Sequence, residues 1–353
     1  MTEHSFDVVD PKLDDKDLTR VGQAVLEEAK AGAIRVAKEH SLPDDETSFE
    51  HIMKERLDAA EPFVRAQAVG KLTQIADNPT LRKQELGSRF VNIDLENRNI
   101  VADAKLDHQT IGGIRRYEEL LRREDVGTNH PFDPVVRDWH PNPTDFEPRQ
   151  EYRFNGVSFM LDKVYCVDET GWDWSGSDEI SLGGITVDED GEVGQIGPFS
   201  VSNDFDTGEW RNYSPDRRVN YFNVREGGEK WPKVYTAHIV MVERDWGDFP
   251  QWLQTLYNKA TEKIEEYIET YVSSLTGPVI ARWVKAVANW FFDKALTWIR
   301  GIWEDDVIDN HTFQLTHAGP QASFGGSANS STTIRNYYGG GGKYRTWTYW
   351  NFE

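Results

Sequence analysis

The sequence predicts an α+β protein, in which an N-terminal helical domain precedes an antiparallel β-sandwich with an inserted amphipathic helical hairpin. Three observations predict this class. Apolar residues recur with a helical period over the first third of the chain, they alternate or cluster as in strands from about residue 154, and the helical period returns near 252. The predicted parts are a helical domain at 1–126, a Pro-rich linker at 127–150, and a β-sandwich domain at 151–353 with the hairpin at 251–303.

The N-terminal domain carries the start signals of several helices. Asp14 can cap a first helix, and further helices are predicted at 48–61 and 62–76. The Asp-Asn-Pro sequence at 77–79 starts another helix, because a cap residue is followed by a proline that fits the first helical position. A last helical stretch covers 110–123.

The linker and the strands are indicated by turn residues. Five of the fifteen prolines lie between 127 and 148, where little periodicity is present. Short apolar runs separated by Gly, Asp and Asn then predict an antiparallel sandwich. These runs are 157–161, 164–166, 180–182, 185–187, 196–199, 219–224, 234–242, 312–315, 332–335 and 344–352. In the last run, Tyr344, Thr346 and Thr348 alternate with Arg345, Trp347 and Tyr349.

The hairpin consists of two amphipathic helices at 252–275 and 278–303. A Thr-Gly-Pro turn joins them, with glycine ending one helix and proline opening the next. An aromatic-rich helix pair can lie in a bilayer interface or bind a partner. The predicted contact residues are Trp283, Trp290, Phe291 and Trp298. The alternative is that this apolar face packs on the N-terminal helices or on the sandwich, which would make these residues part of a core.

Composition restricts the function. The net charge of −21 disfavours nucleic-acid binding and suits divalent cations or basic partners, although solubility or a saline habitat also explains it. The single cysteine, Cys166, excludes an intrachain disulfide. Residues 1–17 lack the features of a Sec-type signal, and no long apolar run is present. We therefore expect a soluble protein that is cytoplasmic or exported by a specialised route. The sequence does not determine the oligomeric state.

Three acidic segments lie next to predicted strands. The first, at 168–179, contains three aspartates spaced five residues apart, and the second, at 243–248, directly follows a strand. The third, at 304–309, directly precedes one. Calcium takes six to eight oxygen ligands, which flexible loops rich in carboxylates supply. The second and third segments become two sides of one inter-strand loop if the hairpin is an insertion at its tip.

These acidic loops and the strands around them resemble the calcium loops of C2-like β-sandwich domains. The resemblance implies that aspartates at one end of the sandwich bind Ca²⁺ and that the loaded loops contact lipid. The corresponding ligand candidates are Asp168, Asp173, Asp178, Asp245, Asp248, Asp305 and Asp306. The long insert and the glycine-rich tail depart from the family pattern, which leaves strand order and the ligand set open. Acidic turns that bind no metal are the alternative.

The sequence therefore predicts a non-enzymatic calcium-binding protein that engages a membrane or a protein partner, as a bacterial toxin or effector would. One alternative is a structural or interaction module without metal. Another is a carbohydrate-binding or carbohydrate-active protein, for which Trp172, Trp174 and Trp347 are candidate contacts among thirteen tryptophans. No enzyme class is predicted, because nothing selects a catalytic carboxylate pair and the common nucleophile and nucleotide motifs are absent.

Overall fold

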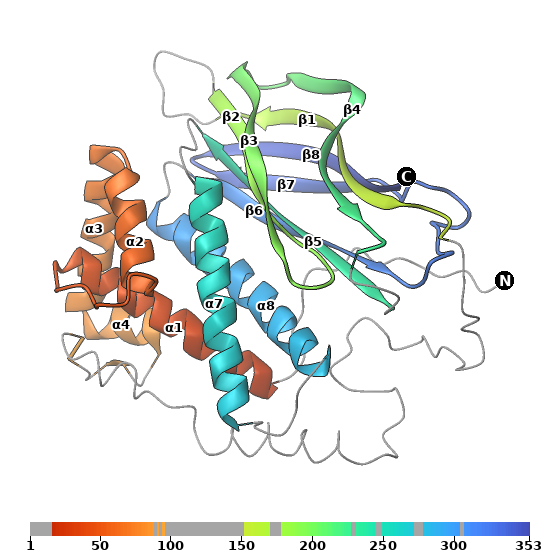
Figure 1. Ribbon diagram of the computed structural model, residues 1–353. Coiled ribbons are helices and arrows are strands. Elements are labelled where there is room, and N and C mark those ends of the chain that lie inside the picture. The colour runs from red at the N-terminus through yellow and green to blue at the C-terminus, as the bar shows by residue number, and fades with distance from the viewer. Residues whose placement is uncertain are drawn as a thin grey trace. The chain divides into compact units, whose positions relative to one another are not determined.

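The computed structural model describes residues 16–87, 90–91, 94–95, 152–169, 178–226, 231–243, 249–271, 278–303 and 307–353 (Figure 1). These residues form an α+β fold, which confirms the predicted class, and they divide into two compact units. The helical unit contains the described helices, from 16–95 and 249–303, and the β unit contains the described strands, from 152–243 and 307–353. The predicted helix at 110–123 and the predicted linker at 127–150 lie outside the described residues.

The helical unit begins with helices whose starts follow the local signals. Its first four helices are α1 (Lys16–Ala37), α2 (Phe49–Ala59), α3 (Pro62–Asp77) and α4 (Pro79–Leu86). The Oδ1 atom of Asn78 accepts hydrogen bonds from the backbone of Thr80 and Leu81, at 2.9 and 3.2 Å. Pro79 has no N–H group, so the first backbone donors of this helix are those of Thr80 and Leu81, and the side chain of Asn78 accepts from both. The helix start predicted at 77–79 is thus confirmed.

Two later helices belong to the described part of this unit. They are α7 (Phe249–Tyr271) and α8 (Pro278–Ile302), which pack on each other and on α1. Their apolar side chains are buried, and Phe291 lies against Phe49 of α2 with ring centroids 6.4 Å apart. The hydroxyl of Tyr257 donates to Oδ1 of Asn289 at 2.8 Å, which joins the two helices by a buried hydrogen bond.

The β unit contains two antiparallel sheets of four strands each. The strands are β1 (Gly156–Asp168), β2 (Asp178–Val187), β3 (Val193–Phe205), β4 (Trp210–Asn223), β5 (Lys233–Glu243), β6 (Val307–His317), β7 (Thr333–Gly339) and β8 (Gly342–Phe352). Their order is β4-β1-β8-β7 in the first sheet and β3-β2-β5-β6 in the second. Side chains from both sheets form one hydrophobic core. Phe159 of β1, for example, packs on Phe313 of β6 and on Trp350 of β8, at centroid distances of 4.8 and 4.9 Å.

Two strands differ from the sequence prediction. The runs at 157–161 and 164–166 belong to a single strand, β1, whose register shifts between Leu161 and Lys163. Strand β4 begins at Trp210, well before the apolar run predicted at 219–224. It is an edge strand with many exposed polar residues, so its first half offers no apolar run. Pro215 fits there because an edge strand needs fewer backbone donors.

Candidate functional site

The candidate site lies on the outer face of the first sheet, the face directed away from the core. Strand β8 defines this face, since its residues alternate strictly between buried and partly exposed positions. Tyr344, Thr346 and Thr348 point into the core, and Arg345, Trp347 and Tyr349 point outward. The alternation predicted for this strand is therefore confirmed, because successive side chains of a strand point to opposite faces.

Strand register brings aromatic side chains together on this face. Trp347 lies opposite Lys163 of β1 and Ile334 of β7, while Tyr165 of β1 lies opposite Trp210 of β4. The rings of Tyr165 and Trp210 stack at 4.3 Å, and those of Trp210 and Trp347 meet at 5.1 Å with an angle of 40° between their planes. Tyr165, Trp210 and Trp347 thus form a continuous surface across three strands, called the aromatic patch below.

The aromatic patch belongs to an exposed part of the molecule. Five large hydrophobic side chains are substantially exposed among the described residues. Four of these five lie on β4 and β7 of this sheet. They are Trp210, Tyr221, Ile334 and Tyr338, which are 43–50% exposed. Scattered exposed apolar residues need no explanation, but a grouping on one face is typical of a binding surface.

Cationic side chains lie among these rings. The Nζ atom of Lys163 is 5.6 Å from the ring centroid of Trp210 and 5.3 Å from that of Trp347. The guanidinium of Arg345 lies 5.9 Å from Trp347, and Nζ of Lys343 lies 5.3 Å from the ring of Tyr338. At these distances the ring faces attract the positive charges, which helps to hold both partners in place.

A tyrosine–aspartate pair lies beside the patch. The hydroxyl of Tyr349 donates to Oδ2 of Asp216 at 2.7 Å. Burial and this hydrogen bond, together with the negative charges of Asp216 and Asp162, raise the pKa of Tyr349 to about 12. The hydroxyl therefore stays protonated near neutral pH, and the pair offers fixed polar atoms next to an aromatic surface.

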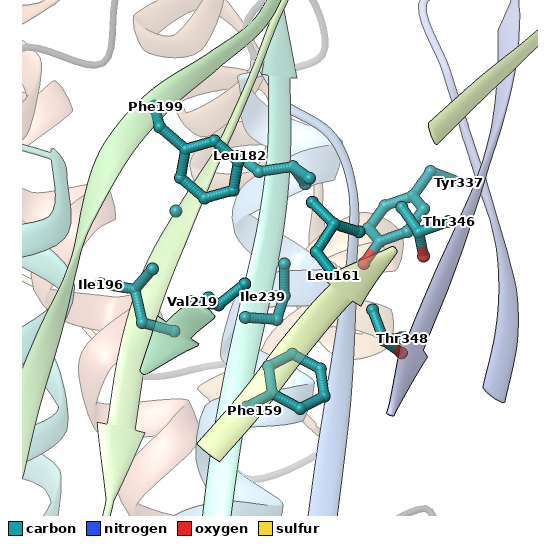
Figure 2. A pocket seen from close by; sticks show the side chains of 11 residues that line it. Phe159, Leu161, Leu182, Ile196, Phe199, Val219, Ile239, Tyr337, Thr346 and Thr348 are labelled. Atoms are coloured by element: carbon teal, nitrogen blue, oxygen red, sulfur yellow. The ribbon is translucent and has the colours of Figure 1, made fainter. Parts of the chain in front are cut away.

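The interior of the β unit offers no comparable site in its described part. Figure 2 shows a cavity in the core, lined by apolar side chains such as Phe159, Leu182 and Ile239 and by the hydroxyl groups of Tyr337 and Thr346. Its volume is about 10 Å³, the space of a single water molecule. A sugar or a lipid chain does not fit there, so the outer face is the better candidate.

Of the predicted calcium ligands, the structure describes two, and each lies at the end of a strand. Asp168 is an exposed residue at the end of β1, and Asp178 begins β2. The other five predicted ligands, Asp173, Asp245, Asp248, Asp305 and Asp306, lie outside the described residues. In the described part of the chain, no group of three or more His, Cys, Asp or Glu side chains is placed to hold a metal.

The predicted membrane contacts lie in the helical unit. Trp283 and Phe291 are 3% and 0% exposed, so they form part of its core. Trp290 is partly buried beside Gly22 of α1, and the ring of Trp298 lies 5.4 Å from Nζ of Lys30. None of the helices in the described ranges is long and apolar enough to cross a membrane. Membrane contact by these four residues stays a prediction, and for the buried Trp283 and Phe291 it requires that the helical unit open.

The sequence pointed to Trp347 but not to the residues around it. Trp172 and Trp174, the other tryptophans proposed to contact a glycan, lie outside the described residues. Trp210 was missed because the first half of β4 has no apolar run, although its Trp-Arg-Asn-Tyr sequence does place two aromatic side chains three residues apart. Comparison of the chain with family models, curated proteins and solved structures finds no match.

Proposed function

We propose that this protein binds carbohydrate, that its two sheets form a β-sandwich, and that the glycan lies on the outer face of the first sheet. The observation that carries the proposal is the aromatic patch, in which Trp210 is 44% exposed and contacts Trp347. Two packed sheets of four strands are also the architecture of many lectin domains.

The chemistry of a sugar matches such a surface. One face of a pyranose ring presents C–H groups that pack on an aromatic ring, which removes apolar area from water. The hydroxyl groups at the edge of the sugar need hydrogen-bond partners, and specific sites combine apolar walls with a few placed polar groups. Asp216, Tyr349 and Asn336 provide such groups on the same sheet.

Binding is proposed rather than hydrolysis. A glycosidase requires two carboxyl groups that flank the scissile bond, one of them as an acid and the other as a base or nucleophile. Two aspartates of this sheet already have partners: Asp216 accepts from Tyr349, and Asp162 forms an ion pair with Lys163 at 3.5 Å. They are therefore better suited to positioning side chains than to proton transfer.

The proposal is tested by binding measurements with a panel of soluble polysaccharides, using affinity electrophoresis and calorimetry. We expect Trp347→Ala and Trp210→Ala each to weaken binding about tenfold, which corresponds to the loss of one stacking contact. Phe63→Ala is the control, since it removes an exposed aromatic ring from α3 in the helical unit. Circular dichroism shows whether the variants are folded. Binding to none of the polysaccharides, or equal binding by all variants, would refute the proposal.

Calcium binding is a second candidate function, and strand order favours it. Ile180 of β2 pairs with Glu243 of β5, and Val242 of β5 pairs with Val307 of β6. The start of β2, the end of β5 and the start of β6 therefore lie at one edge of the second sheet. The three acidic segments are attached to these strand ends, as a calcium site built from several loops requires.

Calorimetric titration of the chelator-treated protein with calcium tests this second function. The double variant Asp173→Asn/Asp305→Asn is expected to lose both the heat of calcium binding and the rise in melting temperature that calcium causes. Asp190→Asn is the control, because Asp190 is exposed in the turn after the other end of β2. The absence of both effects in the native protein would refute calcium binding.

A further inference from the structure

The outer face of the first sheet has an unusual charge arrangement for a chain whose net charge is −21. Strand β8 directs Lys343 and Arg345 outward, next to Trp347. Arg345 uses only part of its hydrogen-bonding capacity, since its Nε donates to Oδ1 of Asn336 at 2.8 Å. Its two terminal nitrogens make no hydrogen bond or ion pair within the described residues.

The carboxylates near this face do not neutralise Arg345. Asp162 pairs with Lys163 at 3.5 Å, Asp216 accepts from Tyr349, and Glu353 pairs with Arg218 at 3.2 Å. Asp168 is exposed and lies opposite Lys343, not Arg345, in the strand register. Arg345 therefore has no ion-pair partner among the residues that the structure describes. Acidic residues outnumber basic ones by 60 to 39, so composition alone would not predict an arginine that lacks a carboxylate partner.

Contact with the ring of Trp347 explains only part of this placement. A cation over a partly exposed ring gains only a weak attraction, and this contact leaves the terminal N–H groups of the guanidinium unused. Arginine presents its terminal N–H groups as a planar fork that matches a carboxylate with two parallel hydrogen bonds. A carboxylate on a ligand that already lies on the aromatic patch would complete both interactions.

We propose that this face binds an acidic glycan, a polysaccharide of uronic acids, with Arg345 pairing with a sugar carboxylate while Trp347 and Trp210 pack on the sugar rings. This inference rests on the carbohydrate-binding function proposed above and specifies its ligand class. A uronate carries its carboxylate on the same sugar ring whose C–H face packs on an aromatic side chain, so a guanidinium beside Trp347 is placed to pair with it. Double-helical nucleic acid presents a denser negative charge, which a −21 protein repels more strongly.

The test compares acidic polysaccharides with their neutral counterparts. Polygalacturonate and alginate are each used beside a carboxyl-reduced form that keeps the sugar chain and removes the charge. All measurements contain EDTA, which separates this question from calcium binding. We expect the native chain to bind at least one acidic form about tenfold more tightly than its reduced form, and added salt to diminish the difference.

Two arginine variants distinguish a specific role from a general effect of charge. Arg345→Gln is expected to lose the preference for the acidic form, so that the ratio of its affinities for the acidic and reduced forms falls to about one. Arg218→Gln changes the net charge equally on the same sheet, but Arg218 already pairs with Glu353, so its variant should retain the preference. Trp347→Ala should weaken binding to both forms.

The outcomes separate the two proposals. If the native chain binds reduced and acidic forms equally, or if both arginine variants behave alike, the acidic-glycan inference is wrong and carbohydrate binding stands. If no polysaccharide of either kind binds, both are wrong. Tighter binding to vesicles of anionic phospholipid than to any of the acidic polysaccharides would also overturn the inference.

Discussion

The buried histidine His317 leads to a prediction about stability at acidic pH. It lies on β6 opposite Lys233 of β5, with the ring of Trp231 at 4.8 Å and that of Phe352 at 4.6 Å. The side chain is 1% exposed, and neither ring nitrogen has a hydrogen-bond partner within the described structure. Burial, and to a lesser extent the positive charge of Lys233, lowers the pKa of His317 to about 4.

The sign of the effect follows from the two protonation states. Above the unfolded pKa of about 6.5, His317 is neutral in both states and contributes no pH dependence. As the pH falls from there to about 4, the unfolded chain binds a proton that the folded chain does not, so stability is lost. At 1.36 kcal/mol per pH unit, the loss between about pH 7.5 and about pH 4.5 amounts to about 2.5 kcal/mol.

The substitution His317→Phe removes this titration and fits the aromatic surroundings. We expect the variant to lose about 2.5 kcal/mol less than the native protein between these two pH values. Cys166 is buried in the core of the β unit and is the single cysteine, so its labelling by dithiodipyridine in increasing urea reports the opening of this unit alone. Rates are normalised to those of the unfolded chain at each pH, and His40→Gln is the control. An equal pH dependence in His317→Phe and native protein would refute the reasoning.

Three further substitutions test the packing. Gly184→Ala should destabilise the β unit by about 1–3 kcal/mol, because Gly184 has φ of +142° and a Cβ would overlap the carbonyl oxygen of His238. An unchanged urea midpoint in thiol labelling would contradict this. Lys233→Met should lower the stability of the β unit by about 3–5 kcal/mol in the same assay, since it leaves the Glu189 carboxylate, 2.9 Å from the ammonium, without its charge partner. Adding Glu189→Gln to this variant should recover part of the loss. Tyr257→Phe should lower helical-unit stability by about 1–3 kcal/mol in melts followed by circular dichroism, and thiol protection in the β unit should not change.

The sequence by itself determined the class of the fold and several local features. A period of two in β8 separated the core residues from Arg345, Trp347 and Tyr349, because neighbouring side chains of a strand point to opposite faces. The cap at Asn78 was readable because capping depends on residues next to each other in the chain. Apolar periodicity also located α7 and α8, whose buried faces bear aromatic residues.

Only the tertiary structure decided which distant side chains meet. Alternation shows that Trp347 leaves the core, but the pairing of β1 with both β4 and β8 is what brings it to Trp210. Likewise, an amphipathic pattern shows that α8 buries one face, and the packing with α1 and α7 shows that this face lies in a helical core. The physical reason is that periodicity depends on local backbone geometry, whereas strand register and helix packing depend on contacts between segments far apart in the chain.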